Sequence, residues 1–327
     1  MGRNPVTGAL EPLDFRHLMD NLYEFRSLNV IVDTYSFPDP IDSSNMDPQH
    51  WARLARIVAD RYEAYDGFVI LHGTDTMAYT SSALSFMLRN ITKPVILTGS
   101  QLPIGQPRTD AKENLLTSIE LAAACDQEGH ARVPEVCIYF NGHLLRGNRA
   151  TKQNAEGFNA FESFNYPHLC DAGVSFTFRT HHILTPDRHL PLSLQTQMNP
   201  HVVVFSLFPG IQENIARHMF DAPELRGIVM RSFGSGNAPQ KPWLTRLLKD
   251  ATQRGVTIVN ISQCVAGFVK MGRYDTGFQL QDAGVVSGGD STVESAITKL
   301  MFLQAHYKDP RVIRNLMGRS ICGEITK

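Results

Sequence analysis

Residues 66–88 hold the sequence feature that most restricts the fold: a short apolar run, a polar turn and a helical pattern. Residues 68–71 are Phe-Val-Ile-Leu, which suits a strand buried on both faces, and residues 77–88 space Met, Ala, Leu and Phe as a helix does. The polar residues 72–76 therefore join the carboxyl end of a strand to the amino end of a helix. Open α/β sheets place ligands there, and free backbone N–H groups attract anionic groups.

The same alternation of strand-like and helical segments continues along the chain and predicts an α/β fold with a largely parallel sheet. Residues 141–158 are polar and rich in Arg, Asn and Lys, and we expect them to form a loop. The predicted strands are 29–34, 68–71, 94–98, 135–140, 174–179, 201–207, 227–231 and 256–261. The predicted helices are 48–65, 77–88, 114–124, 242–254, 292–307 and 310–317.

The 327 residues are enough for two domains, each with its own core. Pro186, Pro191 and Pro200 interrupt a polar segment, after which a new α/β pattern begins. We therefore predict an N-terminal domain at residues 1–180, a linker at 181–200 and a C-terminal domain at 201–327. The glycine motifs of dinucleotide-binding and P-loop proteins do not occur in the sequence.

Charge and hydropathy argue against nucleic acids and membranes as partners of this chain. The formal net charge is -1, so the sequence predicts no bulk attraction to nucleic acid or to an anionic membrane. No apolar run approaches the roughly 18–20 residues that span a bilayer, and the first residues lack a secretory signal pattern. We expect a soluble, cytoplasmic protein.

Cysteine and histidine spacing gives no sign of a metal site or a disulfide framework. The five cysteines are scattered without a Cys-x-x-Cys pair. The chain has twelve histidines, but none forms a His-x-x-x-His pattern on a helix. The adjacent His181 and His182 would point to opposite sides of an extended strand. We therefore predict no metal site.

Thr74 and Asp75, in the turn after the first buried strand, are the strongest candidates for chemistry. A threonine hydroxyl is a poor nucleophile unless a neighbouring base or lysine takes its proton. Lys152 could supply that group if its loop folds over the same strand ends. The alternative is that Thr74 and Asp75 only cap the helix and that Lys152 is a solvated surface lysine.

Two further polar turns could contact a ligand. Ser43 and Ser44 follow Asp42 and precede a predicted helix, so they could donate hydrogen bonds to a small carboxylate. Asp47 and Pro48 also read as an ordinary helix start. Asn237 lies in a glycine-rich turn that would let the backbone approach a ligand closely, although such a loop is often no more than a turn.

Several of these segments together resemble the bacterial L-asparaginase family, in the same order and at similar spacing. They are Asp-Ser-Ser at 42–44, His-Gly-Thr-Asp-Thr-Met-Ala-Tyr-Thr at 72–80, Thr-Gly-Ser-Gln at 98–101, Gly-Asn-Arg-Ala-Thr-Lys at 147–152 and Gly-Asn-Ala-Pro at 236–239. The variants at 72–80 and 236–239 are similar to the cytoplasmic, type I branch. The resemblance covers essentially the whole chain.

The resemblance implies a fold and an activity. The fold would be two α/β domains, a larger N-terminal one and a smaller, Rossmann-like C-terminal one. The activity would be hydrolysis of L-asparagine to L-aspartate and ammonia without a cofactor. The family works as an intimate homodimer, often paired into a homotetramer, with active sites at the contact between subunits.

The resemblance also implies roles for individual residues. Thr74, Asp75 and Lys152 match the family's catalytic triad. The loop at 42–44 matches the one that binds the substrate's α-carboxylate, and Asp75 also matches the partner of the α-ammonium. Asn237 matches a residue that reaches the neighbouring subunit's site.

A second, activating asparagine site is implied by Thr151 and Arg231. An arginine could hold the effector's carboxylate in a bidentate pair. Arg231 could equally do no more than anchor its loop.

The start of the sequence departs from the family pattern. The family begins with a strand that ends in Thr-Gly-Gly-Thr-Ile and carries the primary nucleophile, whereas this chain begins Met-Gly-Arg-Asn-Pro. We expect a longer natural protein to be an active asparaginase and residues 1–327 alone to be nearly inactive. The lid segment 7–12 also lacks the family's tyrosine, and Tyr23 comes too late to replace it.

Two other functions remain open from the sequence. One is a non-catalytic protein that binds asparagine and regulates, which the missing threonine would favour. The other is an amidotransferase-type subunit. That type usually has an additional N-terminal domain, and this chain has neither the length for one nor a basic surface stripe for RNA.

Overall fold

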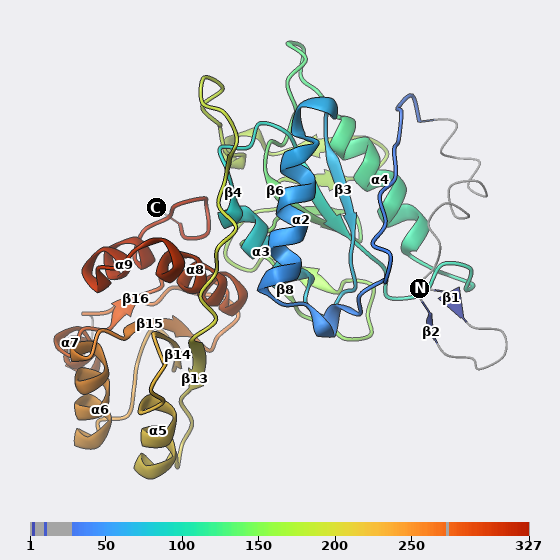
Figure 1. Cartoon of the computed structure of the whole chain (residues 1–327). Coiled ribbons are helices and arrows are strands. Elements are labelled where there is room, and N and C mark those ends of the chain that lie inside the picture. The colour runs from blue at the N-terminus through green and yellow to red at the C-terminus, as the bar shows by residue number, and fades with distance from the viewer. Residues whose placement is uncertain (1, 4–9, 12–27, 273–274, 327) are drawn as a thin grey trace.

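The computed structural model describes residues 2–3, 10–11, 28–272 and 275–326 (Figure 1). Within the first 27 residues it describes two short paired strands, β1 (Gly2–Arg3) and β2 (Leu10–Glu11). Tyr23 and most of the predicted lid at 7–12 therefore lie outside the described residues.

A six-stranded sheet organises the N-terminal half, in the order β11-β10-β7-β6-β5-β3. Its strands β3, β5 and β6 are parallel, whereas β6, β7, β10 and β11 pair antiparallel. The sheet is thus mixed, where we had expected a mostly parallel one. The bounds are β3 (Phe68–Leu71), β5 (Val95–Thr98), β6 (Val136–Phe140), β7 (His143–Arg146), β10 (Cys170–Ala172) and β11 (Phe176–Phe178).

The change of direction comes from a tight turn that we had predicted to be part of a loop. Asn141 and Gly142 have φ values of 49° and 84°, and together they connect β6 to β7. Positive φ at both central residues matches the twist of a two-residue hairpin, and Asn-Gly favours it. The predicted 141–158 loop also contains β8 (Thr151–Lys152), which pairs with β9 (Phe161–Glu162).

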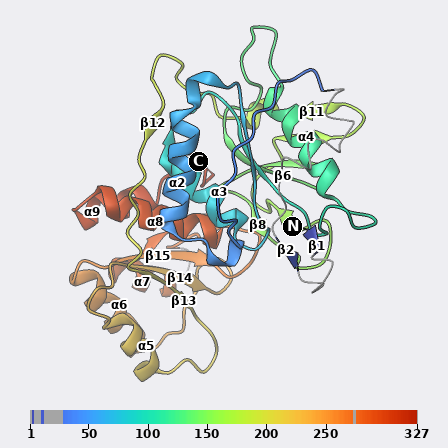
Figure 2. The same ribbon diagram turned by 45° about the vertical axis from the view of Figure 1, so that its right-hand side comes forward.

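Helices cover both faces of this sheet (Figures 1 and 2). The helices α2 (Pro48–Asp60) and α3 (Met77–Met87) share a core with Val95 and Leu97, and α4 (Ala111–Ala123) shares another with Ile96. Successive strand residues point to opposite faces, which explains this alternation. The short 3-10 helices η2 (Ser43–Asn45) and η3 (Tyr62–Ala64) flank α2.

The strand that we predicted at 29–34 is wrong: these residues are described and form no strand. A strand needs a hydrogen-bonding neighbour, and in the described part of the sheet β3 is the outermost strand on that side. Ile31 is accordingly 95% exposed.

A separate sheet organises the C-terminal half, with four parallel strands in the order β13-β14-β15-β16. The helices α5 and α6 cover one face, and α8 and α9 cover the other. This confirms the predicted fold class of two α/β domains. The bounds are β13 (Val202–Ser206), α5 (Glu213–Phe220), β14 (Gly227–Ser232), α6 (Pro242–Gln253), β15 (Thr257–Ser262), α7 (Asp275–Asp282), β16 (Val286–Ser287), α8 (Val293–His306) and α9 (Pro310–Met317).

The two halves meet where α3 packs against α8. The Phe86 and Phe302 rings stack there with centroids 6.0 Å apart. Residues 181–200, our proposed linker, begin within η4 (Thr180–His182) and include β12 (Ser193–Leu194), which pairs with β4 (Leu88–Arg89) at the end of α3. The segment therefore packs along the N-terminal domain before β13 begins.

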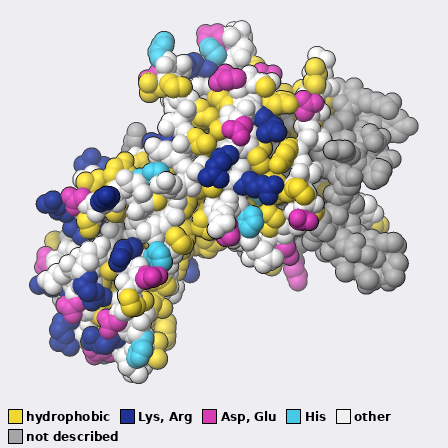
Figure 3. All heavy atoms as spheres, viewed as in Figure 1, with side chains coloured by type: hydrophobic (Ala, Val, Ile, Leu, Met, Phe, Trp, Pro, Cys, Tyr) yellow, Lys and Arg dark blue, Asp and Glu magenta, His cyan; other side chains and the backbone are white. Residues whose placement is uncertain are grey.

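The surface shows mixed charge. On the face drawn in Figure 3, Lys and Arg side chains alternate with Asp and Glu side chains over the C-terminal half. Among the helices of the described residues, none combines the length and apolar character needed to cross a membrane.

Candidate functional site

The turn between β3 and α3 carries Thr74 and Asp75 at the carboxyl end of the sheet. The helix N-cap is Thr76, and its hydroxyl donates to the Ser43 carbonyl at 2.6 Å instead of capping the helix. Thr74 and Asp75 precede this cap, so the capping alternative does not describe them. Gly73 permits the close approach of the loop at residue 43, because a Cβ here would lie 2.5 Å from Ser43 Oγ.

Lys152 reaches this turn from β8, 77 residues further along the chain than Asp75. Its Nζ donates to Thr74 Oγ1 at 2.8 Å and to Asp75 Oδ1 at 2.7 Å. The Lys152 side chain is only 18% exposed, whereas that of Asp75 is 65% exposed. The structure thus brings Thr74, Asp75 and Lys152 together, with the carboxylate facing solvent.

Gln101 completes the polar contacts of Thr74. The Thr74 hydroxyl donates to Gln101 Oε1 at 3.2 Å, while Gln101 Nε2 donates to the carbonyls of Ala155 and Gly157, both at 3.1 Å. The sequence analysis quoted Gln101 in a motif but gave it no role. Its position after β5, in a polar turn beside β3, is the signal that could have found it.

These contacts define what the group can do chemically. The Thr74 oxygen accepts a hydrogen bond from an amine and donates one to an amide, so it is held in one orientation. A proton can pass between Thr74 and Lys152 across a single hydrogen bond, with the Asp75 carboxylate beside the amine. Such a constellation suits activation of a hydroxyl group or a water molecule.

The loop at 42–44 lies against the turn, with Ser43 buried. The Ser44 amide and hydroxyl both donate to Asp42 Oδ1 at 2.9 Å, and these hydrogen bonds lower the pKa of Asp42. A ligand carboxylate at Ser44 would therefore have to exchange with Asp42. Asp47 caps α2 by accepting hydrogen bonds from the Gln49 and His50 amides, which agrees with the ordinary helix start that Asp47 and Pro48 predicted.

A hydrogen-bond chain supports the turn from below. Trp51 Nε1 donates to Thr80 Oγ1 at 3.0 Å, and Thr80 lies 2.9 Å from His72 Nε2. His72 Nδ1 lies 2.7 Å from the Gly73 carbonyl, which can only accept, so Nδ1 carries a proton. Burial lowers the pKa of His72 despite this last contact.

Thr151 and Arg231, the predicted second-site residues, lie near one buried carboxylate that the sequence analysis missed. Thr151 Oγ1 donates to Glu294 Oε1 at 2.6 Å, and the Arg231 charge acts on the same carboxyl group. Glu294 lies in the first turn of α8, 143 residues after Thr151, so no local sequence pattern predicts this contact.

Asn237 belongs to a different half of the chain from the Thr74 turn. It forms a bridge with Phe233 in the tight turn that follows β14 of the C-terminal half. The Thr74 turn belongs to the N-terminal half.

Metal-ligating atoms gather in two places within the described residues, and neither includes a residue of the Thr74 turn. One group is His143, His168 and Asp171, and the other is Asp126, Glu128 and His130.

Comparison with known proteins places both halves of the chain. Residues 1–184 match the family model described as Asparaginase, N-terminal, and residues 201–317 match the Glutaminase/Asparaginase C-terminal domain. L-asparaginase 1 of Escherichia coli K12 is 43% identical over 286 residues, which cover 88% of this chain and 82% of that protein. The mouse 60 kDa lysophospholipase is 40% identical over 87% of this chain and 49% of its own length.

A solved structure agrees with this match. The crystal structure of L-asparaginase I from Vibrio cholerae superimposes with a TM-score of 0.87 at 39% identity, and the match covers 96% of this chain and 92% of that one.

Proposed function

Because the chain belongs to the asparaginase family of amidohydrolases, we propose that it hydrolyses L-asparagine to L-aspartate and ammonia through Thr74, Asp75 and Lys152. The observation that carries this proposal is the pair of hydrogen bonds from Lys152 Nζ to Thr74 Oγ1 and Asp75 Oδ1. They hold a hydroxyl, an amine and a carboxylate within one proton transfer of each other.

The substrate's charged groups have partners in this arrangement. Asp75 exposes 65% of its side chain and can accept the α-ammonium, while Lys152 occupies its Oδ1. Ser43 and Ser44, with Asp42, would receive the α-carboxylate beside Gly73. The side-chain amide would then lie near Thr74.

The primary nucleophile is proposed to be a threonine of a Thr-Gly-Gly-Thr-Ile segment, and no such segment occurs in the printed sequence. Among the strands that the structure describes, β3 is the outermost on its side of the sheet, which supports a place for a further parallel strand beside it. We therefore expect low turnover from residues 1–327 alone.

We also propose a cytoplasmic homodimer or dimer of dimers in which Asn237 contributes to the neighbouring subunit's site. The Gly-Asn-Ala-Pro segment at 236–239, which resembles that of the asparaginase family, supports this role for Asn237. Thr151 and Arg231, gathered around Glu294, are proposed to bind a second asparagine that raises activity.

Ammonia release from L-asparagine tests the proposal. We would measure it for residues 1–327 and for the same chain extended upstream by a strand that ends in Thr-Gly-Gly-Thr-Ile. We expect turnover from the extended chain, and Lys152→Met in it should lower kcat by about 10²–10⁴-fold, because proton transfer contributes by about that factor. Lys249→Met, at an exposed lysine of α6, is the matched control and should leave kcat unchanged.

If neither chain released ammonia from L-asparagine, the proposal would be contradicted. Calorimetric binding of asparagine without turnover would then support the regulatory alternative. Turnover that survives Lys152→Met would keep the activity but remove Lys152 from the mechanism.

A further inference from the structure

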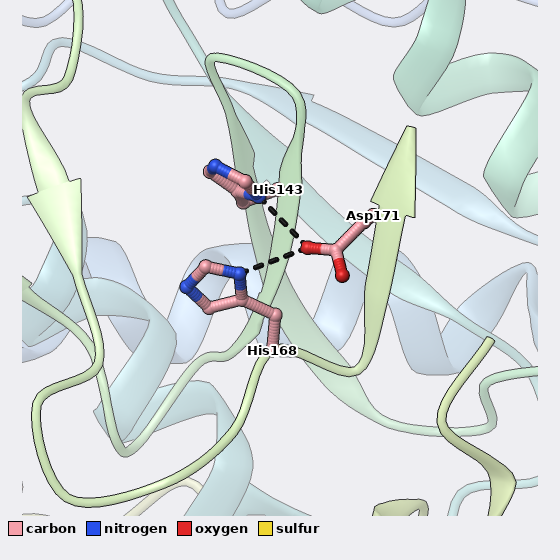
Figure 4. A group of neighbouring side chains, drawn as sticks. All are labelled: His143, His168 and Asp171. Carbon is pink, nitrogen blue, oxygen red and sulfur yellow. Dashed lines mark hydrogen bonds and ion pairs between the residues drawn. The ribbon is translucent and has the colours of Figure 1, made fainter. Parts of the chain in front are cut away.

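His143, His168 and Asp171 form a side-chain cluster that the proposed function does not use (Figure 4). His143 begins β7 and Asp171 lies directly opposite it on the antiparallel strand β10. His168 stands three residues before Asp171. Both rings turn Nδ1 toward the same oxygen, Asp171 Oδ1, and each Nδ1 lies 2.9 Å from it.

The surroundings of the cluster favour a cation at its centre. His168 Nε2 lies 2.9 Å from Glu162 Oε1, so carboxylates face both nitrogens of this ring. A neutral imidazole has only one N–H, and its other nitrogen would then present a lone pair to a carboxylate oxygen. A proton or a metal ion must therefore lie between one nitrogen of His168 and its carboxylate partner.

Asp171 is prepared to act as an anionic ligand. Its two carboxylate oxygens have different neighbours. Arg179 contacts Oδ2 and leaves Oδ1 to the two histidines. The Asp171 carboxylate is thus held in one orientation, with Oδ1 toward both rings.

We propose that His143 Nδ1, His168 Nδ1 and Asp171 Oδ1 bind a divalent transition metal ion such as Zn²⁺, with water as the remaining ligand. Zn²⁺ commonly binds imidazole nitrogens together with a carboxylate oxygen, whereas Ca²⁺ and Mg²⁺ prefer ligand sets made of oxygen atoms. Two imidazoles and one carboxylate therefore suit Zn²⁺. Since the His143 side chain is 42% exposed, an ion and its water have access.

The distances agree with this assignment. In a tetrahedral Zn²⁺ site, metal–ligand bonds of about 2.0–2.2 Å place the ligand atoms about 3.3–3.6 Å apart. The two 2.9 Å contacts need to open by only about half an ångström to admit the ion. Glu162 on His168 Nε2 and Arg179 on Asp171 Oδ2 are the kind of outer partners that orient metal ligands.

The site would tie three segments together: β7, β10 and the loop between β9 and β10. Local spacing could not reveal it, because His143 and His168 are 25 positions apart and meet only through strand pairing. The metal site shares no residue with the proposed hydrolysis of asparagine.

Zn²⁺ binding to the purified chain tests the proposal, with a chromogenic chelator as competitor. We expect one Zn²⁺ per chain, and His143→Gln and His168→Gln should each raise the apparent Kd at least tenfold. His130→Gln is the matched control, because His130 belongs to the other group, with Asp126 and Glu128, and it should leave the Kd unchanged. Replacement by Co²⁺ should give the intense visible absorption of a four-coordinate site.

Circular dichroism of each variant separates loss of ligand from loss of fold. Zn²⁺ binding that is absent from the wild type, or unchanged in both folded histidine variants, would overturn the assignment. Loss of binding in His130→Gln alone would also overturn it, since the ion would then lie in the other group. Because ammonia release is not measured, these outcomes are independent of the proposed activity.

Discussion

At the scale of single residues, protonation of His72 would make the stability of the Thr74 turn depend on pH. Its pKa is lowered by burial, which outweighs the opposing effect of its contact with the Gly73 carbonyl. The folded chain therefore takes up the His72 proton at a lower pH than the unfolded chain does. Above the pKa of an unfolded histidine, about 6.5, the neutral ring costs the folded chain nothing. As the pH falls from there toward the lower pKa of folded His72, the folded chain loses stability relative to the unfolded one.

Replacing His72 should remove this part of the pH dependence. His72→Asn keeps a donor near Nδ1 for Gly73 but loses the contact with Thr80, so we expect a cost of about 1 kcal/mol at pH 7.5. The difference from the wild type should shrink at pH 5.5, where the wild type also loses stability. Urea unfolding at both pH values measures this, and a gap that widens at pH 5.5 would contradict the argument.

At the scale of elements, the segment that carries Lys152 is held by the C-terminal tail. Arg149, which is 2% exposed, lies just before β8, and its guanidinium contacts the Asp290 carboxylate at 2.9 and 3.1 Å. It also donates to the Glu324 carbonyl and to the Thr326 hydroxyl. The position of β8 therefore depends on residues far along the chain.

Arg149→Met should destabilise the protein by about 3–5 kcal/mol, because it leaves the buried Asp290 carboxylate without its partner. Asp290→Asn should cost a comparable amount for the converse reason. The double variant should cost clearly less than the sum, since neither charge is then left alone. Chemical denaturation of the four proteins gives the coupling energy, and additive costs would show that the pair is not coupled.

The elements also show what the sequence could predict and what it could not. Strands such as β5 and β15 are apolar runs buried on both faces, and the patterns placed them within one or two residues. The β6–β7 hairpin was missed because polar composition was given more weight than the Asn141-Gly142 signal. The strand at 29–34 failed because pairing, which no local pattern reports, decides whether a strand forms.

The candidate site divides in the same way. Thr74, Asp75 and the loop at 42–44 follow recognisable strand ends, so the sequence could propose them. That Lys152 would meet them depended on how its loop folds, and the resemblance supplied the remaining reason to pair them. Gln101 follows a predicted strand end and could have been proposed, although its contact with Thr74 depends on the pairing of β3 with β5. Glu294 could not be assigned, because its partner Thr151 is distant in sequence and is brought near by the packing of whole elements.

At the scale of the whole molecule, Glu294 joins the two halves beside the candidate site. It belongs to α8 of the C-terminal half and accepts from Thr151 on β8 of the N-terminal half at 2.6 Å. Burial raises its pKa and outweighs the lowering by Thr151, Thr292 and Arg231. A carboxyl group whose pKa is raised by folding contributes stability to the folded chain below the pKa of the unfolded group, about 4.3. That contribution is lost as the pH rises through the pKa of the folded group.

Glu294→Gln should therefore be at least as stable as the wild type at pH 7.5, because the amide oxygen still accepts from Thr151 and no buried charge forms. The advantage should shrink as the pH is lowered to 4.5, because the raised pKa makes the folded wild type take up this proton at a higher pH than the unfolded chain does. Glu294→Ala is the control: it leaves the Thr151 hydroxyl without its acceptor and should cost about 1–3 kcal/mol at both pH values. Denaturant unfolding of the three proteins at both pH values decides the matter. A wild type more stable than Glu294→Gln at pH 7.5 would contradict this argument, and would mean that the ionised carboxylate, between Thr151 of the N-terminal half and the Arg231 charge of its own half, stabilises the folded chain.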